Sequence, residues 1–156
     1  MRKASILLAD NHPELLEATS ENLEEVGYRV VTAASPEEAK ERLENEHLHL
    51  AILDLRLDDD YDEKDKSGLR VAQSVAPSLP KLIWTRFTND FSVVVEALRA
   101  EVGELPPAVD FIKKEKKIGG LLKAVERALD KHVHINEDLI VHWETTLSFL
   151  HWIFDK

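Results

Sequence analysis

Short apolar runs alternate with helix-like segments along residues 5–131, and this alternation constrains the fold more than any other feature of the sequence. Four of the runs are too short for helices and mostly lack polar alternation, which is typical of buried strands. A fifth run is β-branched and follows Gly27. In chain order the five runs are residues 6–9, 28–32, 48–53, 82–84 and 108–112.

The segments between these runs carry helix start and stop signals. Pro13 suits a first helical position and Gly27 a helix end, while Ser35, followed by Pro36 and Glu38, forms a capping box. Later helices are predicted to begin at Ser67 or Gly68, at Asn89 or Asp90, and along the apolar stripe Ile118, Leu121, Leu122, Val125 and Leu129. Strand and helix alternating five times predict an α/β fold, a doubly wound parallel sheet with helices on both faces.

The length of 156 residues suits one domain with an appended element. We predict a domain over residues 1–131 and a C-terminal helical extension over residues 132–156. Within the extension an apolar stripe follows helical spacing: Trp143, Leu147, Leu150 and Phe154. This face either packs on its own domain or forms an interface with a second copy or a downstream module.

Charge and composition narrow the classes of partner. Thirty acidic residues against twenty basic ones give a net charge of −10, so we expect no direct contact with nucleic acid. The chain has no cysteine and no apolar stretch of roughly 20 residues that would cross a bilayer. We therefore expect a cytoplasmic protein without a membrane contact.

Polar residues follow four of the five apolar runs. Asp10 and Asn11 come after the first, Asp54 after the third, Thr85 after the fourth, and the pair Lys113 and Lys114 after the fifth. In an open parallel sheet, ligands bind beyond the carboxyl ends of the strands. A carboxylate nucleophile, oxygen ligands for a divalent cation, a hydroxyl and an ammonium group are suited to phosphoryl transfer.

The segments LLADNHPELLE, HLAILDLRL, KLIWT and VDFIKK resemble, in order and spacing, the strand-end motifs of response-regulator receiver domains, which are CheY-like domains of two-component systems. The resemblance covers residues 4 to about 130. It implies a flavodoxin-like (βα)5 fold with strand order 2-1-3-4-5. It also implies a phosphorelay switch that takes its phosphoryl group from a sensor histidine kinase or phosphotransfer protein, and that is not an enzyme beyond promoting its own phosphorylation and dephosphorylation.

The resemblance also assigns roles to single residues. Asp54 corresponds to the phosphoacceptor, Thr85 and Phe111 to the switch residues, and Lys114 to the lysine that contacts the phosphate. The magnesium ligands that it implies are Asp10, Asn11, Asp54 and the backbone carbonyl of Arg56.

Three residues depart from the family pattern. Asn11 stands where a second acidic residue is usual, so we expect weaker Mg²⁺ binding. Arg86 replaces a small residue and either obstructs the site or pairs with the phosphoryl group, and Glu115 replaces a proline. These departures motivate an alternative, a pseudo-receiver that acts as a protein-interaction module without phosphorylation.

A hydrolase of the haloacid dehalogenase type is disfavoured because Arg56 occupies the place of its second aspartate.

Overall fold

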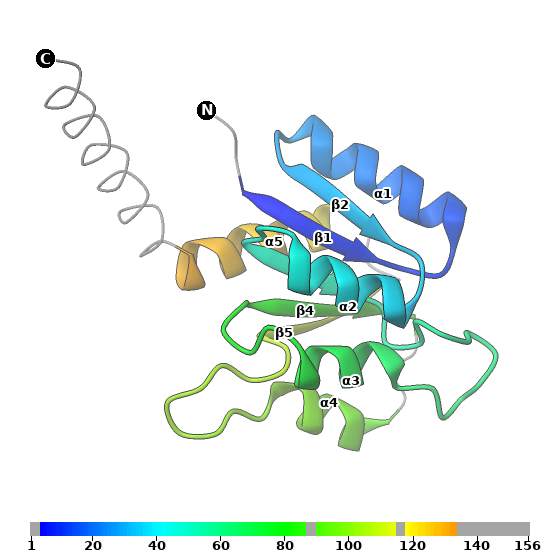
Figure 1. The fold of residues 1–156 in the computed structure, drawn as a ribbon, viewed down its shortest axis with the longest axis vertical. Helices are drawn as coiled ribbons and strands as arrows, with labels where there is room; N and C mark the ends of the chain where they lie inside the picture. Colours follow the sequence, from blue (N-terminus) through cyan, green and yellow to red (C-terminus); the bar gives the residue numbers. More distant parts are fainter. Residues whose placement is uncertain (1–3, 87–89, 115–117, 134–156) are drawn as a thin grey trace, which may run out of the picture.

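The computed structural model describes residues 4–86, 90–114 and 118–133 of the chain. In this part, five parallel strands form one sheet in the order β2-β1-β3-β4-β5, which confirms the predicted topology (Figure 1). The strands are β1 (Ser5–Ala9), β2 (Arg29–Ala33), β3 (Leu50–Leu53), β4 (Lys81–Thr85) and β5 (Asp110–Lys113).

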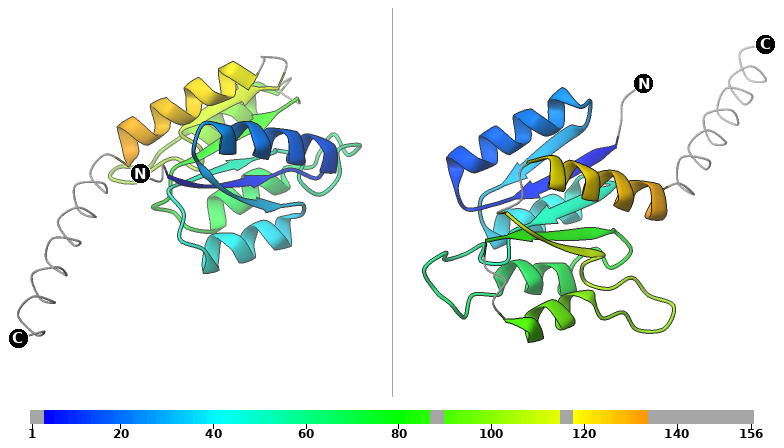
Figure 2. Two further views of the ribbon diagram at one scale, coloured as in Figure 1. Left: turned by 90° about the horizontal axis from the view of Figure 1, so that it is seen from above. Right: turned by 180° about the vertical axis from the view of Figure 1, so that it is seen from behind.

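Five helices connect and flank these strands within the described residues: α1 (Pro13–Glu25), α2 (Pro36–Asn45), α3 (Ser67–Ser74), α4 (Phe91–Leu98) and α5 (Ile118–His132). Figure 2 shows α1 and α5 on one face of the sheet and α2, α3 and α4 on the other. Helices therefore cover both faces, as expected for a doubly wound sheet.

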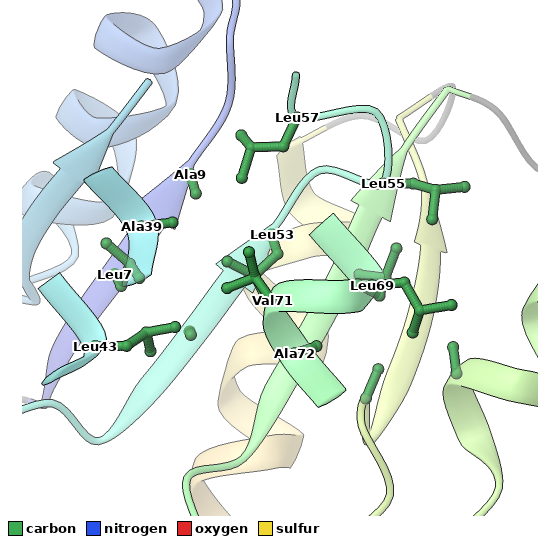
Figure 3. Close-up of a cluster of buried hydrophobic side chains, with 14 of the residues drawn as sticks. Leu7, Ala9, Ala39, Leu43, Leu53, Leu55, Leu57, Leu69, Val71 and Ala72 are labelled. Atoms are coloured by element: carbon green, nitrogen blue, oxygen red, sulfur yellow. The ribbon is translucent and has the colours of Figure 1, made fainter. Parts of the chain in front are cut away.

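Each face of the sheet has its own hydrophobic core, because alternate side chains of a strand point to opposite faces. Leu7, Leu53 and Leu69 belong to one cluster, under α2, α3 and α4 (Figure 3). Leu8 and Ile52 belong to the second cluster, under α1 and α5. The central residues of the strands are apolar, as expected where helices cover both faces of a sheet.

Local signals set the helix starts as the sequence predicts. The Ser35 hydroxyl accepts a hydrogen bond from the Glu38 N–H at 3.1 Å, which caps α2. The Asp90 carboxylate accepts one from the Ser92 N–H at 2.9 Å, which caps α4. Three strands begin later than predicted: β2 begins at Arg29, β3 at Leu50 and β5 at Asp110.

Several predicted features lie outside the described residues. They include the extension beyond Val133 with its stripe Trp143, Leu147, Leu150 and Phe154, and also Glu115. The roles predicted for them stay predictions. Where the structure describes the chain, none of the helices has the length and apolar character needed to cross a bilayer.

Candidate functional site at the carboxyl edge of the sheet

The sheet itself positions the residues that follow its strands. The Asp54 N–H donates to the carbonyl of Ala9 at 3.0 Å, which ties the residue after β3 to the end of β1. The Lys114 N–H donates to the carbonyl of Thr85 at 2.9 Å, which ties the residue after β5 to the end of β4. Backbone pairing thus continues past the strand ends and brings the side chains of Asp54, Thr85 and Lys114 to the same edge as Asp10.

Lys114 joins the two carboxylates. Its Nζ donates to Asp54 Oδ2 at 2.9 Å and also to Asp10 Oδ2. The Lys114 side chain is 6% exposed, and those of Asp10 and Asp54 are 2% and 4% exposed. Lys113 points to solvent, so only the second lysine of the pair reaches the site. The three charges form one buried ionic group with a net charge of −1.

Burial raises the pKa of Asp54 above its ordinary value. The charge of Lys114 acts in the opposite direction, the charge of Asp10 raises the pKa further, and hydrogen bonding by Lys114 and Thr85 lowers it. The pKa of Asp54 is raised overall, because the desolvation of the carboxylate outweighs the stabilisation of its charge by Lys114 and Thr85. The folded chain therefore holds Asp54 in an environment that disfavours its charge.

Two oxygen atoms at this edge are buried and have no hydrogen-bond partner among the described residues. They are Asp54 Oδ1 and Asn11 Oδ1. Buried polar atoms are nearly always paired, so two such atoms on adjacent loops need an explanation. Oxygen atoms of this kind are ligands for a hard cation such as Mg²⁺. The donor set therefore fits a magnesium ion.

Carboxylates alone do not make the metal site. The described residues contain no group of three or more histidine, cysteine, aspartate or glutamate side chains arranged to hold a metal. Asp10 also uses its Oδ1 to accept a hydrogen bond from the His12 N–H at 2.9 Å, just before α1. An oxygen ligand set for a cation at this edge would therefore include groups other than carboxylates, such as the buried amide oxygen of Asn11.

The other predicted site residues differ in burial and in the partners of their side chains. Thr85 is fully buried at the end of β4. Phe111 is partly buried and packs against the core under α3 and α4. Arg86 is exposed, and the Arg56 guanidinium donates to the carbonyl of Asp60 at 2.9 Å.

Gly68, whose role the sequence does not reveal, lies against the backbone of Asp54 and Leu55. Its N–H donates to the carbonyl of Leu55 at 3.0 Å. A β-carbon at this position would overlap the backbone carbonyl oxygen of Asp54 and lie 2.8 Å from its carbonyl carbon. Only glycine lets α3 begin this close to the end of β3. In the sequence, Ser67 followed by Gly68 predicted only that a helix begins here.

The acidic loop of residues 58–66 is ordered by Asp65, another role that the sequence did not reveal. Asp65 Oδ2 accepts the N–H groups of Asp58 at 3.1 Å and Asp59 at 2.7 Å, and Oδ1 accepts the N–H of Ser67 at 2.7 Å. Burial acts to raise the pKa of Asp65, but the donated hydrogen bonds outweigh it and lower the pKa. The loop is therefore built around one carboxylate beside the site.

The family of the chain follows from a comparison with known proteins. Residues 6–126 match the family model described as the response regulator receiver domain. The chain belongs to this family, and the receiver identification made from its motifs is confirmed.

The chain is similar to proteins of several organisms. It is 29% identical over 141 residues to the transcriptional regulatory proteins GlrR of Escherichia coli K12 and QseF of Escherichia coli O157:H7, covering 83% of this chain but only 27% of theirs. The CheY-like receiver domain protein of Methanospirillum hungatei is 26% identical with a TM-score of 0.71, over 86% of this chain and 98% of that one. Brucella abortus NtrX in complex with ADP has a TM-score of 0.69 at 24% identity, over 94% and 30% of the two chains.

Proposed function

We propose that the chain is a phosphoacceptor receiver in which a histidine kinase or phosphotransfer protein phosphorylates Asp54 in the presence of Mg²⁺. The observation that carries the proposal is the buried ionic group of Asp10, Asp54 and Lys114, together with the unpaired Oδ1 of Asp54. A structural ion pair would satisfy all of its oxygen atoms. An unpaired oxygen on the family's nucleophile position leaves that group open for chemistry.

The chemical step forms one bond and breaks one. A carboxylate oxygen of Asp54 attacks the phosphorus of the partner's phosphohistidine, the P–N bond breaks, and the imidazole leaves with its electron pair and is protonated. The product is an acyl phosphate on Asp54. Lys114 Nζ, already 2.9 Å from Asp54 Oδ2, balances part of the negative charge that arrives with the phosphoryl group.

Receiver domains generally bind Mg²⁺ at an acidic pocket. In this chain Asp10, Asn11, Asp54 and the backbone carbonyl of Arg56 would hold the ion, which supplies charge neutralisation for the phosphoryl oxygens when bound. Because Asn11 contributes a neutral amide instead of a carboxylate, the site has one negative charge fewer than usual. We propose that Mg²⁺ binds more weakly for this reason.

The phosphoryl group changes the surface that partners contact. It adds about −1.5 to −2 of charge at Asp54, and Thr85 and Lys114 shift toward it, with Phe111 following. The neighbouring helix α4 exposes Phe91 and Val95, whose exposed fractions are 78% and 44%. We propose that this apolar helix face belongs to the partner-binding surface, because exposed apolar side chains grouped on one helix mark contact sites.

Phosphorylation is tested by incubating the chain with Mg²⁺ and acetyl phosphate and measuring its intact mass. We expect a gain of one phosphate that disappears in Asp54→Asn and remains in Asp58→Asn, a matched change of an exposed acid in the neighbouring loop. Removing Mg²⁺ with a chelator should abolish the gain. Retention of the phosphate in Asp54→Asn would refute the assignment.

A pseudo-receiver is the second candidate, and the exposed Arg86 and the amide of Asn11 favour it. In that case the ionic group would only stabilise the fold, and the chain would act by protein contact alone. The two candidates differ in the same assay, since a pseudo-receiver gains no phosphate at any Mg²⁺ concentration.

We also propose a contact for the C-terminal extension of the chain. The stripe Trp143, Leu147, Leu150 and Phe154 is proposed as the contact with a second copy, with a downstream module or with the domain itself. The chain spans 27% of the length of the two Escherichia coli relatives, which are named transcriptional regulatory proteins. The absence of a nucleic-acid contact and a cytoplasmic location therefore stay predictions.

A further inference from the structure

The aromatic ring of Trp84 lies beside the lysine of the site. It lies in β4 directly before Thr85, and its side chain is buried, with the residue 5% exposed. Lys114 Nζ is 5.0 Å from the centroid of the Trp84 ring and 2.9 Å from Asp54 Oδ2. The ammonium group thus has both an aromatic ring and a carboxylate as neighbours. This distance is within the range of a cation–π interaction, and tryptophan is the strongest aromatic partner.

The N–H of the Trp84 indole does not account for the presence of a tryptophan. Nε1 is buried and has no hydrogen-bond partner among the described residues. A buried indole N–H usually has a partner, and leaving it unpaired is unfavourable. A phenylalanine or leucine would fill this part of the core without that cost. What tryptophan adds here is the face of its ring, and the charged group at that face is Lys114.

We propose that Trp84 is a positioning residue that holds the Lys114 ammonium at the two carboxylates; the inference rests on the proposed function. Lysine is a long, flexible side chain, and keeping its ammonium group buried in one place costs conformational entropy. When Asp54 becomes an acyl phosphate, its pairing with Lys114 changes. The attraction of the ring does not depend on the state of Asp54, so it keeps the ammonium group at the site in both states.

A role in core packing alone makes a different prediction. Trp84 also belongs to the hydrophobic cluster under α1 and α5, together with Leu8, Ile112 and Leu121. If the residue only filled this cluster, a smaller side chain would lower stability and affect phosphorylation equally with or without Lys114. If it positions Lys114, its effect on phosphorylation requires Lys114.

A double-mutant cycle separates these two roles. We would measure the rate of phosphorylation by acetyl phosphate with Mg²⁺ in the wild type, Trp84→Leu, Lys114→Met and the double variant. We expect Trp84→Leu to slow the wild type about tenfold and to slow Lys114→Met less than about twofold. Trp84→Phe, which keeps an aromatic face, should stay within about threefold of the wild type. An equal loss in both backgrounds, or no difference between Phe and Leu, would overturn the inference. Urea unfolding of each variant shows that it is folded.

The contact itself can be tested without phosphorylation. In an NMR spectrum of the full chain, ring currents should move the Lys114 ε-methylene protons upfield, and Trp84→Leu should return them to the ordinary lysine position. An unshifted signal in the wild type would overturn the inference even if Asp54 is phosphorylated. A shifted signal in a chain that takes no phosphate would support the Trp84–Lys114 contact while refuting the phosphoacceptor role.

Discussion

Replacing Gly68 with alanine introduces a methyl group where two backbone segments meet. The new β-carbon would overlap the carbonyl oxygen of Asp54, and it would lie 2.8 Å from the carbonyl carbon of Asp54 and 3.2 Å from the Leu55 α-carbon. Ordinary contacts begin at 3.4 Å, so the end of β3 and the start of α3 must separate by at least about 0.6 Å at the carbonyl carbon. No flexible side chain can absorb this shift, because the atoms in contact belong to the backbone.

The free energy of this change follows from two opposing terms. Overpacking a well-packed site costs about 1 to 3 kcal/mol, and a backbone clash belongs at the upper end. Alanine inside a helix recovers about 1 kcal/mol relative to glycine. We therefore expect Gly68→Ala to lower the free energy of unfolding by about 2 kcal/mol. Phosphorylation should also slow, because the carbonyl that moves belongs to Asp54.

Urea unfolding measures the free energy of unfolding and so tests this prediction. Gly119→Ala is the matched control. Gly119 lies in α5 and is exposed, and a β-carbon there would have nothing within 4 Å. This control should gain about 0.5 to 1 kcal/mol from helix propensity alone. If Gly68→Ala is as stable as Gly119→Ala, the close approach of α3 to Asp54 does not constrain the domain, and our reasoning is wrong.

Two further predictions concern buried charges. Burial lowers the pKa of Lys81 from 10.5 to about 8, so the folded state binds this proton less tightly than the unfolded state. Stability should rise by up to about 3 kcal/mol between pH 8 and pH 10.5, and urea unfolding at several pH values should show no such rise in Lys81→Met. Burial raises the pKa of Asp54, so the folded state binds that proton more tightly and stability falls as pH rises through the interval between the unfolded and folded values. Asp54→Asn should therefore be more stable than the wild type at neutral pH by thermal unfolding, and equal or lower stability would contradict this.

The fold could be predicted from the sequence because its signals are local. Each strand is built around a short apolar run, and α1, α2 and α4 start at a proline or at a capping side chain such as Ser35 or Asp90. The strand order 2-1-3-4-5 came from the family resemblance and was confirmed. Strand starts were less certain, because an apolar residue such as Leu48 or Ala108 also packs well just outside a strand.

The contacts within the site were harder to predict because they join distant parts of the chain. Residue types at strand ends predict which edge is polar, but they do not reveal that Trp84 faces Lys114, thirty residues later. Gly68 and Asp65 gave local signals of a helix start and an acidic loop. Their real partners are the backbone of Asp54 and the N–H groups of Asp58 and Asp59, and these contacts depend on the path of the folded loop.

The burial of this edge is itself an argument that it serves a function. Polar residues at strand ends usually lie in solvent, yet Asp10, Asp54 and Thr85 are 1%, 3% and 0% exposed. Burying carboxylates is unfavourable unless they are fully paired. Lys114 pairs with both, but Asp54 Oδ1 remains unpaired and the pKa of Asp54 stays raised. A chain selected only for stability would place an apolar or amide side chain at residue 54, so the buried carboxylate supports the phosphoacceptor role that we propose for it.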